Sequence, residues 1–168
     1  MKFRILLDEN SEMAAIHAAI AVFAEAGAEM TEDETGDDVV AICPSLTRIL
    51  TQPEMEAYRG VLVLHPSLLP TRRGPSAVKW AVVDGDGVGG VTWFWACTGL
   101  DNGDICSQEA FHIRRGAKAR EVYETQYIPA MARTLRTAID EIMAGYFRRV
   151  PQVLENGSYQ KRFVYGKD

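Results

Sequence analysis

Two short runs of apolar residues without polar alternation constrain the fold of this chain more than any other feature. Val39–Cys43 reads VVAIC, and Val61–Leu64 reads VLVL. Strands that are covered on both faces of a parallel sheet have this pattern, because neither face meets water. Segments with helical spacing lie around these runs. The sequence therefore predicts an α/β fold with a mostly parallel sheet and flanking helices.

Apolar spacing, glycine and proline assign the other elements. We expect a strand at 2–7, a helix at 13–26 that Asn10 or Ser11 caps and Gly27 ends, a solvated acidic loop at 29–38, helices at 52–58 and 75–83, strands at 91–96 and 105–113, and a helix at 117–144 that Pro129 kinks or splits. Gly85–Gly90 matches GxGxxG, but it follows a helix and precedes a strand. A dinucleotide-binding loop needs the reverse order, so we interpret this stretch as a turn.

Composition limits the classes of function. A length of 168 residues with 47% hydrophobic residues suits one globular domain, residues 1–168. The net charge of -5 argues against nucleic acid and anionic membranes as partners. The N-terminus lacks the long apolar stretch of a signal peptide, and three cysteines without ligand spacing predict no metal site. We therefore expect a cytoplasmic protein that binds no nucleic acid, membrane or metal.

His65 is the residue that most suggests chemistry. It stands directly after the Val61–Leu64 strand and opens the proline-flanked loop HPSLLP, residues 65–70. Open α/β sheets place their ligands at the carboxyl ends of parallel strands. A second candidate loop, GLDNGD at 99–104, supplies Asp101. The alternative is that His65 is a capping or core histidine.

These motifs resemble those of the folate-dependent formyltransferases. The resemblance extends from about Val39 to Phe163. Its motifs are HPSLLP, the Arg73–Gly74 pair, a helix with Trp80, GVT at 90–92 and GLDxGD. The local sequence at Phe94–Ala96 is most similar to that of the hydrolase domain of 10-formyltetrahydrofolate dehydrogenase. The resemblance implies a Rossmann-type domain with a shortened N-terminal βα segment at 1–38 and a folate-binding, catalytic core at 39–163.

The resemblance also implies site residues. His65 and Asp101 would act on the formyl group of 10-formyltetrahydrofolate, the formyl donor. Arg73 would either grip the glutamate tail of folate together with Arg72 or tie down the loop. Ser67 would orient this pair, or else bond its own turn as a hydroxyl often does. The folate-binding residues implied by the family motifs are Arg48, Ile49, Leu50, Ala96, Cys97, Thr98 and Asp101.

Two departures bear on the acceptor. Formyltransferases carry an Asn two residues before the His, and here Val63 stands there without a donor. The acidic segment Asp8–Ser11 replaces the usual glycine-bearing loop, which disfavours a phosphoribosyl acceptor. We expect formyl transfer to the amine of a small-molecule acceptor. The alternative functions are hydrolysis of 10-formyltetrahydrofolate and a folate-binding module without turnover. A homodimer in which the short chain completes its sheet is a further alternative arrangement.

Overall fold

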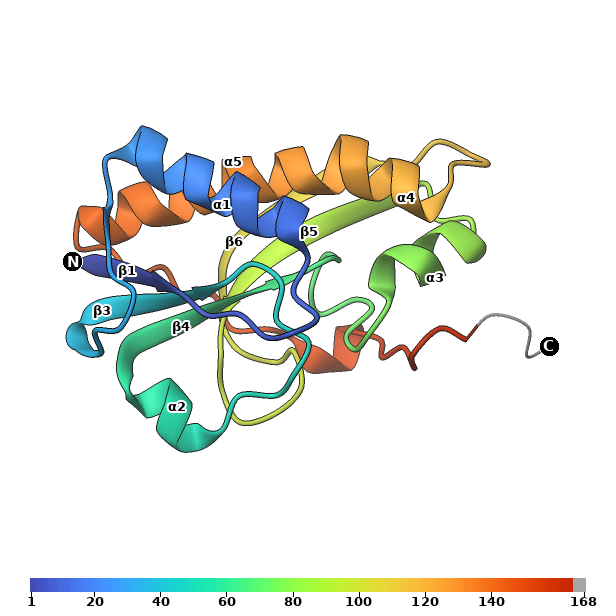
Figure 1. Cartoon of the computed structure of the whole chain (residues 1–168). Coiled ribbons are helices and arrows are strands. Elements are labelled where there is room, and N and C mark those ends of the chain that lie inside the picture. Colours follow the sequence, from blue (N-terminus) through green and yellow to red (C-terminus); the bar gives the residue numbers. More distant parts are fainter. Residues whose placement is uncertain (165–168) are drawn as a thin grey trace.

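A computed structural model gives the structure of the protein and describes residues 1–164 (Figure 1). The last four residues of the expected domain 1–168 lie outside the described residues. In chain order the elements are β1 (Lys2–Ile5), α1 (Met13–Ala26), β2 (Glu29–Met30), β3 (Gly36–Cys43), α2 (Gln52–Glu56), β4 (Tyr58–His65), α3 (Ala77–Val83), β5 (Val88–Trp95), β6 (Ile105–His112), α4 (Ala119–Val122), the π-helical turn η1 (Tyr123–Tyr127), α5 (Ile128–Met143) and the 3-10 turn η2 (Leu154–Asn156).

The six strands form one sheet in the order β2-β1-β3-β4-β5-β6. β2, β1, β3 and β4 are parallel neighbours, whereas β5 runs antiparallel to both β4 and β6. The mostly parallel sheet with flanking helices is therefore confirmed. His65 is the last residue of β4 and pairs with Thr92 of β5, which places it at the carboxyl edge of the parallel strands.

The two faces of the sheet are covered differently. α1 and α5 lie side by side over one face, and α2 lies on the opposite side (Figure 1). The larger core lies under α1 and α5 and includes the fully buried Phe3, Leu62 and Trp93. The smaller core on the other face contains Ala41, Cys43 and Val61, with Leu50 and Val63 packed against it. Folate-binding candidates therefore border the thinly covered face.

Several element boundaries differ from the sequence prediction. The 29–38 segment is not all loop, because Glu29–Met30 pairs with β1 and β3 already begins at Gly36. Glu12, rather than Asn10 or Ser11, is the N-cap of α1, and no side chain caps it. Ser11 instead donates its hydroxyl to the main-chain oxygen of Ser45. Hydrogen bonds with Ser45, in the loop after β3, thus replace a side-chain cap from Asn10 or Ser11.

The predicted 117–144 helix is interrupted before Pro129. α4 passes into the π-helical turn η1, and α5 then begins at Ile128 with the proline in its first turn. Proline has no N–H and crowds the preceding turn, and a π-turn absorbs both defects without ending the helix. The helical run therefore continues from Ala119 to Met143, and a π-helical turn precedes Pro129 where a kink or a split was expected.

Candidate active site

His65 is 6% exposed and its ring is fixed from one side by the chain itself. Its Nε2 lies 2.8 Å from the main-chain oxygen of Arg72, seven residues later. Because a carbonyl oxygen only accepts hydrogen bonds, Nε2 must carry a proton and donate it. The other ring nitrogen, Nδ1, is therefore the one available for proton transfer.

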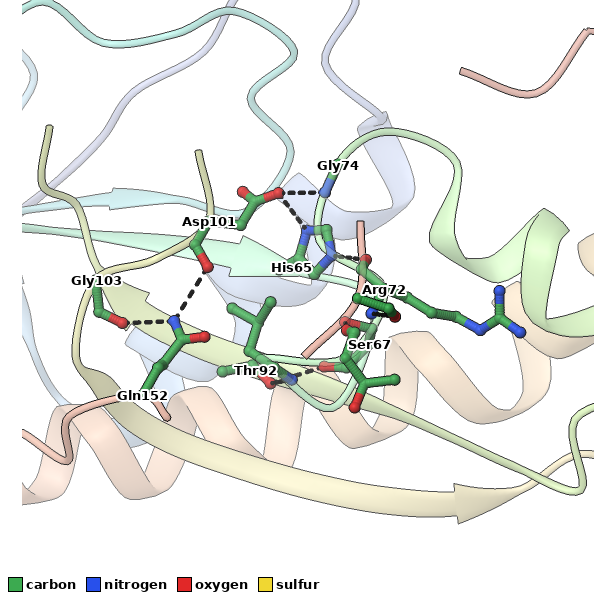
Figure 2. A network of polar contacts seen from close by, with 11 residues as sticks. His65, Ser67, Arg72, Gly74, Thr92, Asp101, Gly103 and Gln152 are labelled. Carbon is green, nitrogen blue, oxygen red and sulfur yellow. Dashed lines mark hydrogen bonds and ion pairs between the residues drawn. The ribbon is translucent and has the colours of Figure 1, made fainter. Parts of the chain in front are cut away.

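Asp101 faces that nitrogen (Figure 2). Its Oδ2 is 3.6 Å from His65 Nδ1 and accepts a hydrogen bond of 2.7 Å from Gly74 N. The contact between the two side chains is attractive when Nδ1 is protonated. Oδ1 accepts no hydrogen bond from residues 1–164. The structure therefore brings His65 and Asp101 together and leaves one carboxylate oxygen to accept a further proton.

The loop after His65 is held by buried hydrogen bonds. Thr92 of β5 donates its hydroxyl to Ser67 O at 2.7 Å and accepts from Leu69 N at 3.2 Å. Gln108 donates to both Thr92 Oγ1 and Leu69 O. Ser67 itself donates to Thr71 O at 2.6 Å, so its hydroxyl bonds the turn instead of His65 or Asp101. The loop is a rigid support for His65.

Arg72 joins this loop to the turn before β5. Its Nε donates to Asp86 at 2.7 Å, and its Nη2 pairs with Asp84 at 2.8 Å. Hydrogen bonding to Asp86 raises the pKa of Arg72. The guanidinium is thus engaged in ion pairs, while the carbonyl of the same residue holds His65. Arg73, the expected tie-down residue, is held through its main chain by Ser158 and Gln160.

The expected pterin segment, Arg48–Leu50, follows β3 and is fastened to the end of β1. Asp8 accepts hydrogen bonds from the main-chain N–H groups of Thr47 and Arg48. Burial alone would raise the pKa of Asp8, but these hydrogen bonds outweigh it and lower that pKa. Arg48 forms an ion pair with Glu54 at 2.6 Å, and Ile49 is 78% exposed. The segment is ordered, yet presents an uncovered apolar side chain.

The second expected folate-binding segment follows β5. Ala96 is half-buried, while Cys97 and Thr98 are exposed. Cys97 donates its thiol to Asn102 Oδ1 at 3.0 Å. Partial desolvation of the thiol and the nearby Asp104 raise the pKa of Cys97, which keeps the thiol protonated. Cys97 is therefore not an activated nucleophile.

Val63 lies on β4, half-buried, opposite Phe94 of β5. It has no polar atom to offer to a developing negative charge. Thr92 is buried and already uses its hydroxyl on Ser67 and Leu69, so it does not replace a missing donor.

Residues that the sequence analysis missed complete the site. Gln152 donates to two main-chain oxygens in the Asp101 loop, and Ser158 contacts the His65 loop. Both lie in the C-terminal segment, outside every motif. Since they bind main-chain atoms, neither spacing nor residue type in the loops signals them.

One cavity lies away from this pair. Its volume is about 470 Å³, and it is lined by the 85–87 turn and the 112–117 loop. His65 and Asp101 remain the candidate site, because among residues 1–164 His65 is the one buried histidine and it lies beside a carboxylate. Within residues 1–164, no group of three His, Cys, Asp or Glu side chains could hold a metal ion. In the same range, no helix is long and apolar enough to cross a membrane.

The sequence of the chain is similar to those of known proteins. The family model described as formyl transferase matches residues 13–131. Cytosolic 10-formyltetrahydrofolate dehydrogenase of Xenopus tropicalis is 35% identical over 100 residues, which are 60% of this chain and 11% of that protein. The chain thus spans about a tenth of that relative's length.

Solved structures share the fold. HypX from Aquifex aeolicus in complex with tetrahydrofolic acid superposes with a TM-score of 0.81 at 21% identity, over 97% of this chain and 30% of that one. The formyltransferase PseJ from Anoxybacillus kamchatkensis, in complex with tetrahydrofolate and a UDP-linked formamido sugar, gives a TM-score of 0.70 at 21% identity, over 96% and 86%.

Proposed function

Because the chain belongs to the formyl transferase family, we propose that it transfers the formyl group of 10-formyltetrahydrofolate to the amine of a small-molecule acceptor. The observation that supports this proposal is the pair His65 and Asp101, with Nδ1 and Oδ2 3.6 Å apart at the carboxyl edge of the sheet. The 10-formyltetrahydrofolate supplies a formyl group activated on N10.

The two side chains divide the proton transfers. The acceptor nitrogen forms a bond to the formyl carbon, and the bond from that carbon to N10 breaks. The acceptor amine loses one proton, which Asp101 accepts on Oδ1, the oxygen without a partner among residues 1–164. His65 donates one proton from Nδ1 to the departing N10. General acid–base assistance of this kind contributes about 100- to 10,000-fold.

The residues around the pair fit a folate. The pterin would lie between Arg48–Leu50 and Ala96–Thr98, whose exposed Ile49 and half-buried Leu50 and Ala96 supply apolar contacts. The relatives and neighbours whose names include formyltetrahydrofolate or tetrahydrofolate support the same donor.

Val63 favours a second candidate function, hydrolysis with water as the acceptor. Removal of one oxyanion donor costs about 100- to 1,000-fold in turnover. Water is smaller than an amine and needs no acceptor pocket. The main-chain N–H groups of Thr47 and Arg48 donate to the Asp8 carboxylate and so tie the loop after β3 to the loop after β1. In this reaction Asp101 accepts the proton of water, and the products are formate and tetrahydrofolate.

One assay separates these functions. We expect the protein to release tetrahydrofolate from 10-formyltetrahydrofolate only when a small amine is present, with one formylated amine per tetrahydrofolate. Absorbance follows the release, and mass spectrometry identifies the product. Release without amine, with equal amounts of formate, would replace transfer by hydrolysis. Binding without release under either condition would establish a folate-binding module.

Val63→Asn tests the missing donor. We expect it to raise kcat at least about tenfold, because a side-chain amide would then stabilise the developing negative charge. Val63→Leu is the matched control, since leucine has nearly the shape of asparagine and no donor. Equal rates for both variants would show that another group already stabilises the oxygen.

A further inference from the structure

The main chain of Asp101 is held in a conformation that it would not adopt freely. Its φ is +50°, in the left-handed region, which is unfavourable for a residue with a Cβ although aspartate enters it more readily than most. Such conformations persist only where surrounding contacts fix them. The residue that fixes this one is Gln152, whose Nε2 donates to Asp101 O at 3.1 Å and to Gly103 O at 2.7 Å (Figure 2).

The amide of Gln152 has one workable orientation. Two carbonyl oxygens face it, so the NH₂ group must point at them, because reversal would set three oxygens together. Its Oε1 is buried and has no partner within residues 1–164. Two residues earlier, Val150 exchanges main-chain hydrogen bonds of 2.8 and 2.9 Å with Ile105, at the start of β6. Gln152 therefore follows closely after a residue pair, Val150 and Ile105, that fixes this part of the chain to the start of β6.

Ser158, six residues after Gln152 in the same C-terminal segment, holds the His65 loop. Ser158 Oγ accepts from Arg72 N at 2.9 Å, and Ser158 O accepts from Arg73 N at 2.9 Å. Arg72 also has a positive φ, +55°, and its carbonyl accepts the hydrogen bond from His65 Nε2. Ser158 thus sets the orientation of the carbonyl that fixes the imidazole. Gln152 and Ser158 themselves lie beyond the region that the family model matches, residues 13–131.

We propose that the C-terminal segment 150–160 is a clamp that positions the His65–Asp101 pair. Gln152 holds the Asp101 loop, and Ser158 holds the His65 loop through Arg72. Both are positioning residues, since they touch loop atoms and not the reacting groups. The clamp fixes the separation of Nδ1 and Oδ2, and the proposal rests on the proposed function of that pair.

Gln152→Glu tests the first arm. It keeps the size of the side chain but turns a donor into an anion that faces two carbonyl oxygens. We expect kcat to fall about 10- to 100-fold, the loss that follows a displacement of about 1 Å at a reacting group. The dissociation constant of tetrahydrofolate should stay within about twofold. Gln126→Glu, on the exposed surface of η1, is the matched control and should leave kcat unchanged.

Ser158→Ala tests the second arm. It removes the acceptor for Arg72 N, and we expect a fall in kcat of about tenfold with unchanged tetrahydrofolate affinity. Ser107→Ala removes a comparable hydroxyl hydrogen bond, to Thr134 O on the helical face, and should not affect kcat. Equal kcat values for the Gln152, Ser158 and control variants would overturn the clamp.

Two further readouts separate positioning from general instability. In an Asp101→Asn background, Gln152→Glu should lower kcat by less than about twofold, because its effect on kcat passes through Asp101. In NMR spectra, Gln152→Glu and Asp101→Asn should both shift the ring signals of His65 but not those of His17. This readout needs no turnover, so it tests the clamp even if the proposed reaction fails. Unchanged His65 signals in Gln152→Glu would refute it.

Discussion

Replacing His65 with asparagine is expected to lower kcat for formyl transfer by about 100- to 10,000-fold, with little loss of folded protein. Asparagine can still donate a hydrogen bond, but it cannot supply a proton to the departing N10. The release of tetrahydrofolate at saturating 10-formyltetrahydrofolate and amine measures the effect. Circular dichroism verifies that the variant remains folded.

His17→Asn is the matched control, because His17 is exposed on α1 and lies outside the site. Asp101→Asn should lose activity on the same scale. The double variant should lose little more than the worse single one, since groups that act as a unit give strongly non-additive losses. Multiplicative losses in the double variant would show that the two side chains act independently.

The sheet was predictable because its signal is local. Burial on both faces leaves the VVAIC and VLVL runs without polar alternation, and both became buried strands. The position of His65 followed from the same signal, since the residue after such a strand stands at the carboxyl edge. The two-residue β2 was missed because Glu29 and Met30 are exposed and carry no pattern of burial.

The contacts that orient the pair were not predictable. The partner of His65 Nε2 is a main-chain oxygen, and every residue type at position 72 supplies one. Gln152 is 51 residues from Asp101 and also bonds only main-chain atoms. The sequence motifs identified which side chains would meet. The atoms that set their separation come from long-range packing, which leaves no local pattern.

Gly74 is the position at which the two loops and the clamp meet. Its N–H donates to Asp101 Oδ2, and its φ is +93°, outside the range of ordinary side chains. A Cβ there would overlap the main-chain oxygen of Gln160 and lie 2.7 Å from a ring carbon of Tyr159. Backbone strain and steric overlap therefore act together at this residue.

Gly74→Ala is accordingly expected to lower the free energy of unfolding by about 2–5 kcal/mol, from left-handed strain and overpacking. Gly85→Ala is the matched control: φ is +74° there too, but no atom lies within 4 Å of the added Cβ. Gly85→Ala should lower the free energy of unfolding only by the backbone strain, about 1–2 kcal/mol. Urea unfolding measures both, and tetrahydrofolate release should fall only in Gly74→Ala, because its N–H positions Asp101. Equal losses of stability would mean that residues 159–160 move aside at little cost, in which case the C-terminal segment could not hold the His65 loop rigidly.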